Sequence, residues 1–221
     1  MEILEKLQCG ERLNYEDGVK LWDLDLFDLG KFAFAIRKEK NGKNVYFNAN
    51  RHINPSNLCA DTCKFCAFSA HRKNENAYTM SDDEIMRIVD ETVARGTKEI
   101  HIVSSHNPFV TPQQYLGIFK AIKQKYPLLH IKAMTAAEID YWRRKWKMGY
   151  EETIGLMMQS GVDSMPGGGA EIFDEQIRDK ICKGKVSSKN WLKIHEMWHE
   201  RGRQSNATML FGHVESRQNR I

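Results

Sequence analysis

The stretch SDDEIMRIVDETVARGTKEIHIVSS, Ser81–Ser105, contains one complete unit of helix followed by strand. Ser81 and Glu84 have the spacing of a capping box, and Gly96 is a typical stop signal, so we expect a helix between them. The apolar residues of this helix recur at helical spacing, and KEIHIVSS then has the apolar character of a buried strand. A helix that leads into a buried strand is the repeating unit of an α/β fold.

The pattern of strand, loop and helix repeats from residue 51 to the end of the chain. Repeats of this kind imply right-handed crossovers and a parallel sheet with helices packed against it. Five strands in succession favour a TIM-type (βα) barrel over a doubly wound sheet, because the unusual residues gather after the strands, where barrels place their active sites. The expected strands are 51–57, 98–105, 128–135, 162–166 and 203–211, and the expected helices are 81–96, 111–127, 136–147, 151–160 and 187–202.

The number of strands is smaller than a closed barrel requires. A barrel of this type has eight strands, and the chain ends shortly after the fifth. We therefore expect an α/β parallel barrel, comprising residues 51–221, that is truncated after its fifth strand. Residues 1–50, whose apolar positions recur at helical spacing, are expected to form an N-terminal helical extension.

The composition is that of a globular protein without a membrane span. The 221 residues are 41% hydrophobic with a net charge of +4. No apolar run approaches about 18 residues, and the N-terminus does not resemble a signal peptide. The basic runs at 71–73 and 143–147 are interpreted as solvated faces, so no nucleic-acid partner is expected. Cys9 and Cys182 are interpreted as incidental thiols, and the cysteine pattern indicates a reducing, cytoplasmic location rather than disulfides.

NLCADTCKFCAFSA, residues 57–70, holds Cys59, Cys63 and Cys66 at the spacing C-x3-C-x2-C. A structural zinc site needs four closed ligands, and no fourth cysteine follows nearby. Thiolates also hold iron–sulfur clusters, and three of them can bind three irons of a [4Fe–4S] cube. The fourth iron is then free for a ligand that does not come from the protein.

This motif, with Phe65 before the last cysteine and directly after the first strand of a parallel barrel, resembles that of the radical S-adenosylmethionine (SAM) superfamily. The resemblance implies a [4Fe–4S] cluster and SAM, whose amino and carboxylate groups chelate the open iron. It also implies a low-potential electron donor such as flavodoxin or ferredoxin. The reduced cluster passes an electron to the sulfonium, which gives methionine and a 5′-deoxyadenosyl radical.

Three segments, 130–139, 163–182 and 203–215, resemble the aminofutalosine synthase family of menaquinone biosynthesis. PGGGAEI is shared with the dehypoxanthine-futalosine cyclase and the deazaflavin-forming synthases, whereas SNATMLFGHVE indicates aminofutalosine synthase. The resemblance implies a transferase that adds the 5′-deoxyadenosyl radical to 3-[(1-carboxyvinyl)oxy]benzoate. Rearrangement and loss of the carboxyl group as CO2 or bicarbonate then give 6-amino-6-deoxyfutalosine. Two alternatives stay open: the related cyclase, which abstracts hydrogen, and a truncated chain that binds a cluster without turnover.

A glycine-rich loop follows the expected fourth strand. Gly167, Gly168 and Gly169 permit close approach of the backbone to a ligand. The string is not G-x-G-x-x-G, because Ile172 stands where the last glycine would be, so the dinucleotide fingerprint is not met. Glu171 has a carboxylate that can accept ribose hydroxyls.

The resemblance implies a further contact at the end of the second strand. Members of the superfamily often carry glycine-glycine-glutamate there for the amino group of SAM, and here two serines take that place, whose hydroxyls can accept a hydrogen bond. Polar groups at strand ends are candidates for binding a dicarboxylate substrate. The expected cofactor-binding residues are therefore Phe65, Ser104, Ser105, Gly167, Gly168, Gly169 and Glu171, and the expected substrate-binding residues are His106, Asn107, Asn206 and His213.

HEMWH, His195–His199, matches the H-E-x-x-H pattern of zinc hydrolases and is the alternative from another class. Two histidines four residues apart on a helix can bind zinc, with Glu196 as the base. However, the helix is a crossover that lies away from the expected barrel mouth, and Trp191 and Trp198 should turn it inward. No HxxGxxH continuation follows.

Overall fold

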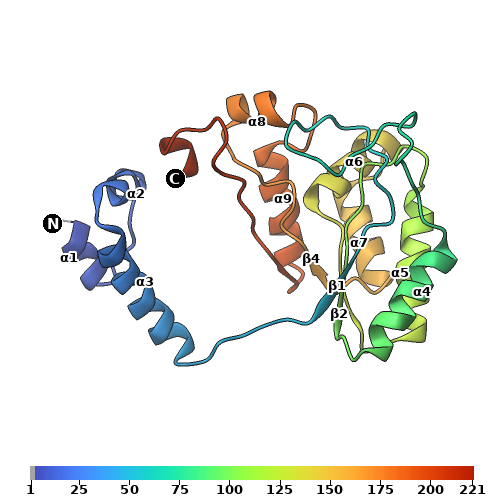
Figure 1. Ribbon diagram of the computed structural model, residues 1–221, viewed down its shortest axis with the longest axis horizontal. Helices are drawn as coiled ribbons and strands as arrows, with labels where there is room; N and C mark the ends of the chain where they lie inside the picture. The colour runs from blue at the N-terminus through green and yellow to red at the C-terminus, as the bar shows by residue number, and fades with distance from the viewer. Residues whose placement is uncertain (1–2) are drawn as a thin grey trace. The chain divides into compact units, whose positions relative to one another are not determined.

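A computed structural model describes residues 3–221 (Figure 1). The chain divides into two compact units. The first consists of residues 3–47 together with Phe211–Ile221, and the second is Asn48–Leu210. The division into domains 1–50 and 51–221 stays a prediction, and the grouping of the last eleven residues with the N-terminal segment had no signal in the sequence.

The first unit is helical, as its apolar spacing predicts. Trp22 joins its two chain segments, because the guanidinium groups of Arg217 and Arg220 each lie 5.4 Å from its ring centroid. Asn14 and Asp17 form a capping box at the start of the second helix. The elements are α1 (Ile3–Gln8), α2 (Tyr15–Lys20), η1 (Leu21–Asp23), α3 (Leu26–Asn41) and η2 (Gln218–Arg220).

The second unit contains a sheet of five parallel strands in the order β1-β2-β3-β4-β5. The α/β class with a parallel sheet is therefore confirmed. β1 and β5 are the two edges of this sheet. The prediction of an α/β barrel truncated after its fifth strand is thus confirmed as a parallel sheet of five strands, and a TIM-type barrel is not confirmed. The strands are β1 (Asn50–Ile53), β2 (Glu99–Ile102), β3 (His130–Ala133), β4 (Ser164–Met165) and β5 (Gln204–Ser205).

The fifth strand is much shorter than the predicted range 203–211. After β5 the chain bonds to the loop that follows β4 instead of to a neighbouring strand. The hydroxyl of Thr208 donates to the carbonyl of Gly167 at 2.6 Å, and the amide of Leu210 donates to the carbonyl of Glu171 at 2.8 Å. Because of these contacts, Thr208 and Leu210 do not pair with a strand of the sheet.

Six helices of the second unit connect the strands. Capping boxes begin α4, α5 and α6 at Ser81, Thr111 and Thr135. α8 was not predicted, because it has only seven residues and a single capping aspartate. Figure 1 shows α4 and α5 side by side, and α6 contacts both α7 and α9. The bounds are α4 (Asp82–Ala94), α5 (Pro112–Lys125), α6 (Ala136–Trp146), α7 (Tyr150–Gln159), α8 (Glu175–Ile181) and α9 (Ser188–His199).

The sheet has one apolar face and one polar face, because successive side chains of a strand point to opposite sides. Ile100, Ile102 and Ile131 are buried in a core that also contains Phe119 and Trp198 from the helices. Each such side chain contributes roughly 1.5–3 kcal/mol when it leaves water. The helices are therefore held on the apolar face, and the strand ends are fixed in place.

The opposite face carries interacting polar groups. Nδ1 of His101 lies 3.1 Å from Nε2 of His52 on the neighbouring strand. Nζ of Lys132 lies 3.3 Å from Oε1 of Glu99. Within residues 3–221, no helix is both long enough and apolar enough to cross a membrane.

Candidate functional site

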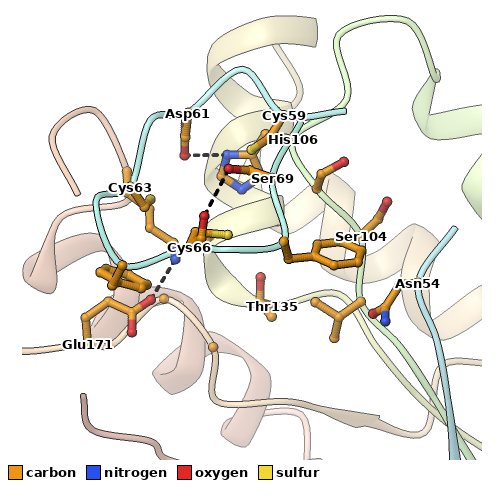
Figure 2. Close-up of a pocket in the computed structure, with 18 residues that line it drawn as sticks. Asn54, Cys59, Asp61, Cys63, Cys66, Ser69, Ser104, His106, Thr135 and Glu171 are labelled. Carbon is orange, nitrogen blue, oxygen red and sulfur yellow. Dashed lines mark hydrogen bonds and ion pairs between the residues drawn. The ribbon is translucent and has the colours of Figure 1, made fainter. Parts of the chain in front are cut away.

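The loops at the carboxyl ends of β1 to β4 meet at one pocket, since parallel strands end at the same edge of a sheet (Figure 2). The pocket brings together most of the residues that the sequence predicts for the site. Of these, its lining contains Cys59, Cys63, Phe65, Cys66, Ser104, Ser105, His106, Gly168, Gly169 and Glu171. Their binding roles remain predictions, and their proximity is a structural finding.

The cysteine loop is tied to two other elements by hydrogen bonds. The hydroxyl of Ser105 donates to the carbonyl of Leu58 at 2.5 Å, which fixes the start of the loop beside the end of β2. The amide of Lys64 donates to the carbonyl of Ile181 at the end of α8, at 2.8 Å. The loop is thus held at its start and in its middle although it contains no helix or strand.

His106 is buried against the cysteine loop and supports it. Its Nδ1 is 2.7 Å from Oδ2 of Asp61, and its ring stacks on that of Tyr141 with centroids 4.6 Å apart. Burial opposes ionisation of Asp61, but the bond with His106 and nearby positive charges outweigh it and hold the pKa of the carboxyl below its usual value. His106 also lines the pocket, and its carbonyl accepts from the amide of Ala60 at 3.0 Å.

The three thiols of the motif are half-buried and free of disulfides. Burial raises the pKa of Cys59, and it raises the pKa of Cys63 to about 11. Both thiols are therefore protonated in the protein alone. A bound iron reverses this preference, because a metal ion deprotonates a thiol that coordinates it.

The donor set fits a [4Fe–4S] cluster, because three thiols line one pocket. Cys59, Cys63 and Cys66 line the same pocket, yet no described group of three metal-binding side chains converges on one ion position. A cube offers a separate iron to each thiolate, so such convergence is not required. Cys182 does not line this pocket; it is buried in a small apolar cluster against which Cys63 packs.

The wall opposite the thiols is built at the start of α6. Oε1 of Glu138 accepts from the amide of Ser104 at 2.9 Å, and Oε2 accepts from the amide of Thr135 at 2.7 Å. The hydroxyl of Tyr115 donates to that of Ser104 at 2.7 Å. Met134 just before the helix has a positive φ of 64°, a conformation that is rare for residues with side chains. The serine backbone is thus fixed by buried groups.

The glycines of the loop after β4 allow close packing of protein against protein. A Cβ atom at Gly167 would lie 2.6 Å from the carbonyl oxygen of Asn206, and one at Gly168 would lie 2.9 Å from the Thr135 methyl group. Gly169 has a φ of +94°, which favours glycine. Gly167 itself lies outside the pocket lining. The close neighbours in the structure are backbone and side chains, and the predicted approach of a ligand to these glycines stays a prediction.

Arg178 of α8 fixes this glycine loop by hydrogen bonds to its carbonyl groups. Its side chain is 4% exposed, and its guanidinium group donates to the carbonyls of Gly169, Ala170, Ile172 and Val186. The loop therefore has a fixed shape despite its glycines, and Glu171 is held at a positive φ of 50°.

Two charged lining residues were not predicted. Asp61 stands between the first two cysteines, and this position was the available signal. Lys185 follows α8 and forms an ion pair with Glu171, with Nζ 2.6 Å from Oε1. No sequence pattern indicated Lys185, because its contact with the pocket depends on how α8 turns back.

Three predicted substrate-binding residues lie outside this pocket lining. Asn107 is 3% exposed and donates to the hydroxyls of Ser56 and Thr79. Asn206 is exposed and lines another pocket beside α9. His213 belongs to the first unit, where its Nδ1 lies 3.0 Å from Oε2 of Glu215.

The HEMWH histidines contact a common serine. Nδ1 of His195 lies 2.9 Å and Nε2 of His199 lies 2.8 Å from the hydroxyl of Ser205. His195 is buried and stacks on Trp191 with centroids 3.7 Å apart. α9 packs Trp191, His195 and Trp198 inward, as the tryptophan positions predict, whereas His199 is exposed. The two histidines thus contact the end of β5.

A parallel α/β fold whose strand-end loops bring three free thiols to one pocket defines a class of enzymes that bind an iron–sulfur cluster. The sequence signature of the radical SAM superfamily matches residues 53–220, and the chain belongs to this superfamily. Its members use a [4Fe–4S] cluster and SAM.

Two relatives illustrate this membership, and one solved structure shares the fold. The chain is 39% identical over 220 residues to aminodeoxyfutalosine synthase of Thermus thermophilus, covering 99% of the chain and 59% of the relative. It is 33% identical to 5-amino-6-(D-ribitylamino)uracil–L-tyrosine 4-hydroxyphenyl transferase of Methanococcoides burtonii, covering 100% of the chain and 60% of the relative. The fold is similar to that of methylornithine synthase (PylB), with a TM-score of 0.75 at 18% identity over 99% of the chain and 62% of that structure. The chain thus spans about three fifths of the length of these proteins.

Proposed function

We propose that this chain is the cluster-binding part of a radical SAM transferase that forms 6-amino-6-deoxyfutalosine for menaquinone biosynthesis. The observation that carries this proposal is the 39% identity to an aminodeoxyfutalosine synthase over almost the whole chain. The pocket adds support, because its thiols and Glu171 lie together as such a reaction requires. The acceptor in this proposal is 3-[(1-carboxyvinyl)oxy]benzoate.

The residues of the pocket have distinct roles in this proposal. Cys59, Cys63 and Cys66 would hold the cluster, which when bound and reduced would supply the electron for cleavage of SAM to methionine and the 5′-deoxyadenosyl radical. Glu171 accepts hydrogen bonds from the ribose hydroxyls of SAM. Phe65 and the other apolar lining residues exclude water from the reacting centre, which protects a radical from side reactions.

Further contacts orient SAM and its acceptor. The hydroxyl of Ser104 already accepts a bond from Tyr115 and retains its own hydrogen to donate. Ser105 uses its hydroxyl on the carbonyl of Leu58, so its contribution is to shape the loop. Gly168 and Gly169 supply backbone along the same wall. His106 lines the pocket beside the thiols and is the predicted acceptor-binding residue that the pocket retains.

A second candidate function rests on other relatives. The chain is 33% identical to enzymes named as 4-hydroxyphenyl transferases that act on ribitylaminouracil and tyrosine. A related dehypoxanthine-futalosine cyclase is a further alternative within the superfamily. The three candidate reactions differ in the acceptor, and the cyclase abstracts hydrogen instead of adding the deoxyadenosyl group.

Product analysis tests the proposal. The protein is reconstituted without oxygen using iron and sulfide, reduced, and incubated with SAM and the enol-ether benzoate. The expected result is an adenosylated product with the mass of 6-amino-6-deoxyfutalosine. Free 5′-deoxyadenosine as the sole nucleoside product would contradict the transferase assignment, and product formation only with ribitylaminouracil and tyrosine would establish the second candidate.

Electron supply is part of the same proposal. A low-potential donor such as flavodoxin or ferredoxin reduces the cluster, and free thiols require a reducing compartment such as the cytoplasm. Comparison of turnover with a reduced flavodoxin and with a chemical reductant tests this partner. Equal rates with a redox-inactive apoflavodoxin would contradict it.

A further inference from the structure

Lys185 is the one lysine or arginine among the described residues that line the pocket. The same lining contains three thiols and the carboxylates of Asp61 and Glu171. When the thiols are ionised by iron, the surroundings of the cluster become strongly negative. A single cation in such a place has a large electrostatic effect, because burial reduces the screening of its charge.

The ammonium group of Lys185 is held between the two loops that form the site. Its Nζ lies 2.6 Å from Oε1 of Glu171, and the two side chains are 16% and 12% exposed. It also lies 5.6 Å from the ring centroid of Phe65 on the cysteine loop. Figure 2 marks the ion pair of Glu171 with a dashed line beside the thiols.

The ion pair with Glu171 keeps the ammonium group of Lys185 protonated. Burial lowers the pKa of Lys185, but Glu171 outweighs this and keeps it above the ordinary value. Lys185 therefore stays positive at all working pH values.

The ion pair also orients Glu171. Lys185 occupies Oε1, and among the described residues no donor bonds to Oε2 of this carboxylate. Arg178 fixes the backbone on both sides of Glu171. Backbone and side chain are thus both constrained, and Oε2 keeps its capacity to accept a hydrogen bond from a ligand in the pocket that Glu171 lines.

We propose that Lys185 is a positioning residue with two effects: it raises the reduction potential of the cluster through its charge, and it orients Glu171 for SAM. This inference rests on the proposed function only in that it requires a cluster at the three cysteines. It does not depend on which acceptor the enzyme uses. The electron that reduces the cluster adds negative charge beside Lys185, so removal of the cation disfavours that addition.

The test measures potential and SAM affinity on the reconstituted chain. Lys185→Gln should make the midpoint potential of the cluster more negative in an electron paramagnetic resonance titration. It should also raise the dissociation constant for SAM about tenfold, the effect of losing roughly 1.4 kcal/mol of binding. Lys185→Arg should restore both values towards the wild type, because the charge is kept.

Glu171→Gln distinguishes charge from structure. It should weaken SAM binding as Lys185→Gln does, but it should make the midpoint potential less negative, because a negative charge is removed. Lys125→Gln, which breaks an exposed pair with Asp90 on the surface, is the matched control and should change neither value. If Lys185 acted only on the structure of the site, Lys185→Gln and Glu171→Gln would not shift the midpoint potential in opposite directions.

Several outcomes would overturn the inference. A potential in Lys185→Gln that is equal to the wild type, or less negative, at equal iron content contradicts the charge effect. If Lys185→Gln does not retain a cluster, the test uses Lys185→Arg and Glu171→Gln instead. An unchanged midpoint potential in Glu171→Gln would then contradict the inference. If the cluster potentials shift as expected but the expected product does not form, only the proposed function is contradicted. If the wild-type chain binds no cluster, the proposed function and the inference about Lys185 are both contradicted.

Discussion

Oδ2 of Asp61 lies 2.7 Å from Nδ1 of His106, and the two side chains are only 10% and 6% exposed. Asp61 belongs to the cysteine loop and His106 to the loop after β2, so the pair joins two segments that are far apart in the sequence (Figure 2). Tyr141 of α6 stacks on the same imidazole. The loop that carries the thiols is therefore supported from inside the protein.

Asp61→Asn should lower the free energy of unfolding by about 2 kcal/mol or more, because breaking a buried pair leaves a polar group poorly compensated. It should also reduce the iron retained after reconstitution and desalting. Urea unfolding and iron analysis measure the two effects. Arg87→Gln removes an exposed pair on α4 and should cost less than about 1 kcal/mol. Equal stability of the two variants would contradict the supporting role.

Cys63→Ala should abolish stable cluster binding and SAM cleavage, because two remaining thiolates leave the cube exposed to solvent. Cys182→Ala should keep iron content close to the wild type, since this thiol lies outside the pocket lining. Because Cys182 is 2% exposed, its truncation should still cost about 1 kcal/mol of stability. Iron content and the characteristic cluster absorbance measure the difference. Normal cleavage by Cys63→Ala would disprove the ligand assignment.

Gly167→Ala should destabilise the protein by about 1–3 kcal/mol, the usual range for overpacking. Its new methyl group would lie 2.6 Å from the carbonyl oxygen of Asn206 and 2.9 Å from the carbonyl carbon of Ala207, and backbone moves less easily than a side chain. Gly117→Ala in α5 is the control, because nothing lies within 4 Å of the added atom. It should stabilise the helix by roughly 0.5–1 kcal/mol. Thermal unfolding compares them, and a neutral Gly167→Ala would refute the close contact.

His195 should make the protein sensitive to acid. Burial and, secondly, the charge of His199 lower the pKa of His195 from 6.5 to about 4. The unfolded chain takes up this proton below pH 6.5 and the folded chain does not, so stability falls as the pH is lowered from about 6.5 to about 4. The loss amounts to about 2 kcal/mol at pH 5.

Urea unfolding at pH 7 and pH 5 measures this dependence. His195→Gln should lose less stability between the two pH values than the wild type does, whatever its stability at pH 7. His71→Gln, at an exposed position, is the control and should follow the wild type. The same dependence on pH in His195→Gln and the wild type would rule out His195 as the group responsible.

The local signals in the sequence predicted most of the elements. Ser81 and Glu84 form the expected capping box, because both partners lie on one helical turn. α8 escaped prediction, since a helix of seven residues shows too few turns for a clear apolar period. The range of β5 was overestimated because Thr208 and Leu210 bond to the loop after β4, a preference that no local pattern carries.

The site was predicted only in part, because local sequence patterns do not carry the contacts between distant elements. The cysteine spacing and the position of Glu171 after a strand were sufficient to place them at one edge of a parallel sheet. The sequence did not predict that Lys185 lines the pocket, because its ion pair with Glu171 depends on the packing of α8 and on the return of the chain to Glu171. Asn107 was assigned to substrate, whereas the structure shows its amide bonded to the hydroxyls of Ser56 and Thr79.

The sequence by itself determined the order of helices and strands, the parallel sheet and the three thiols on one short loop, because these follow from periodicity and spacing between near neighbours. Only the tertiary structure decided which polar side chains face the pocket and which serve as internal supports. Asp61 and His106 show the reason: their contact joins residues 45 positions apart, so it is set by the packing of whole elements and not by local preference.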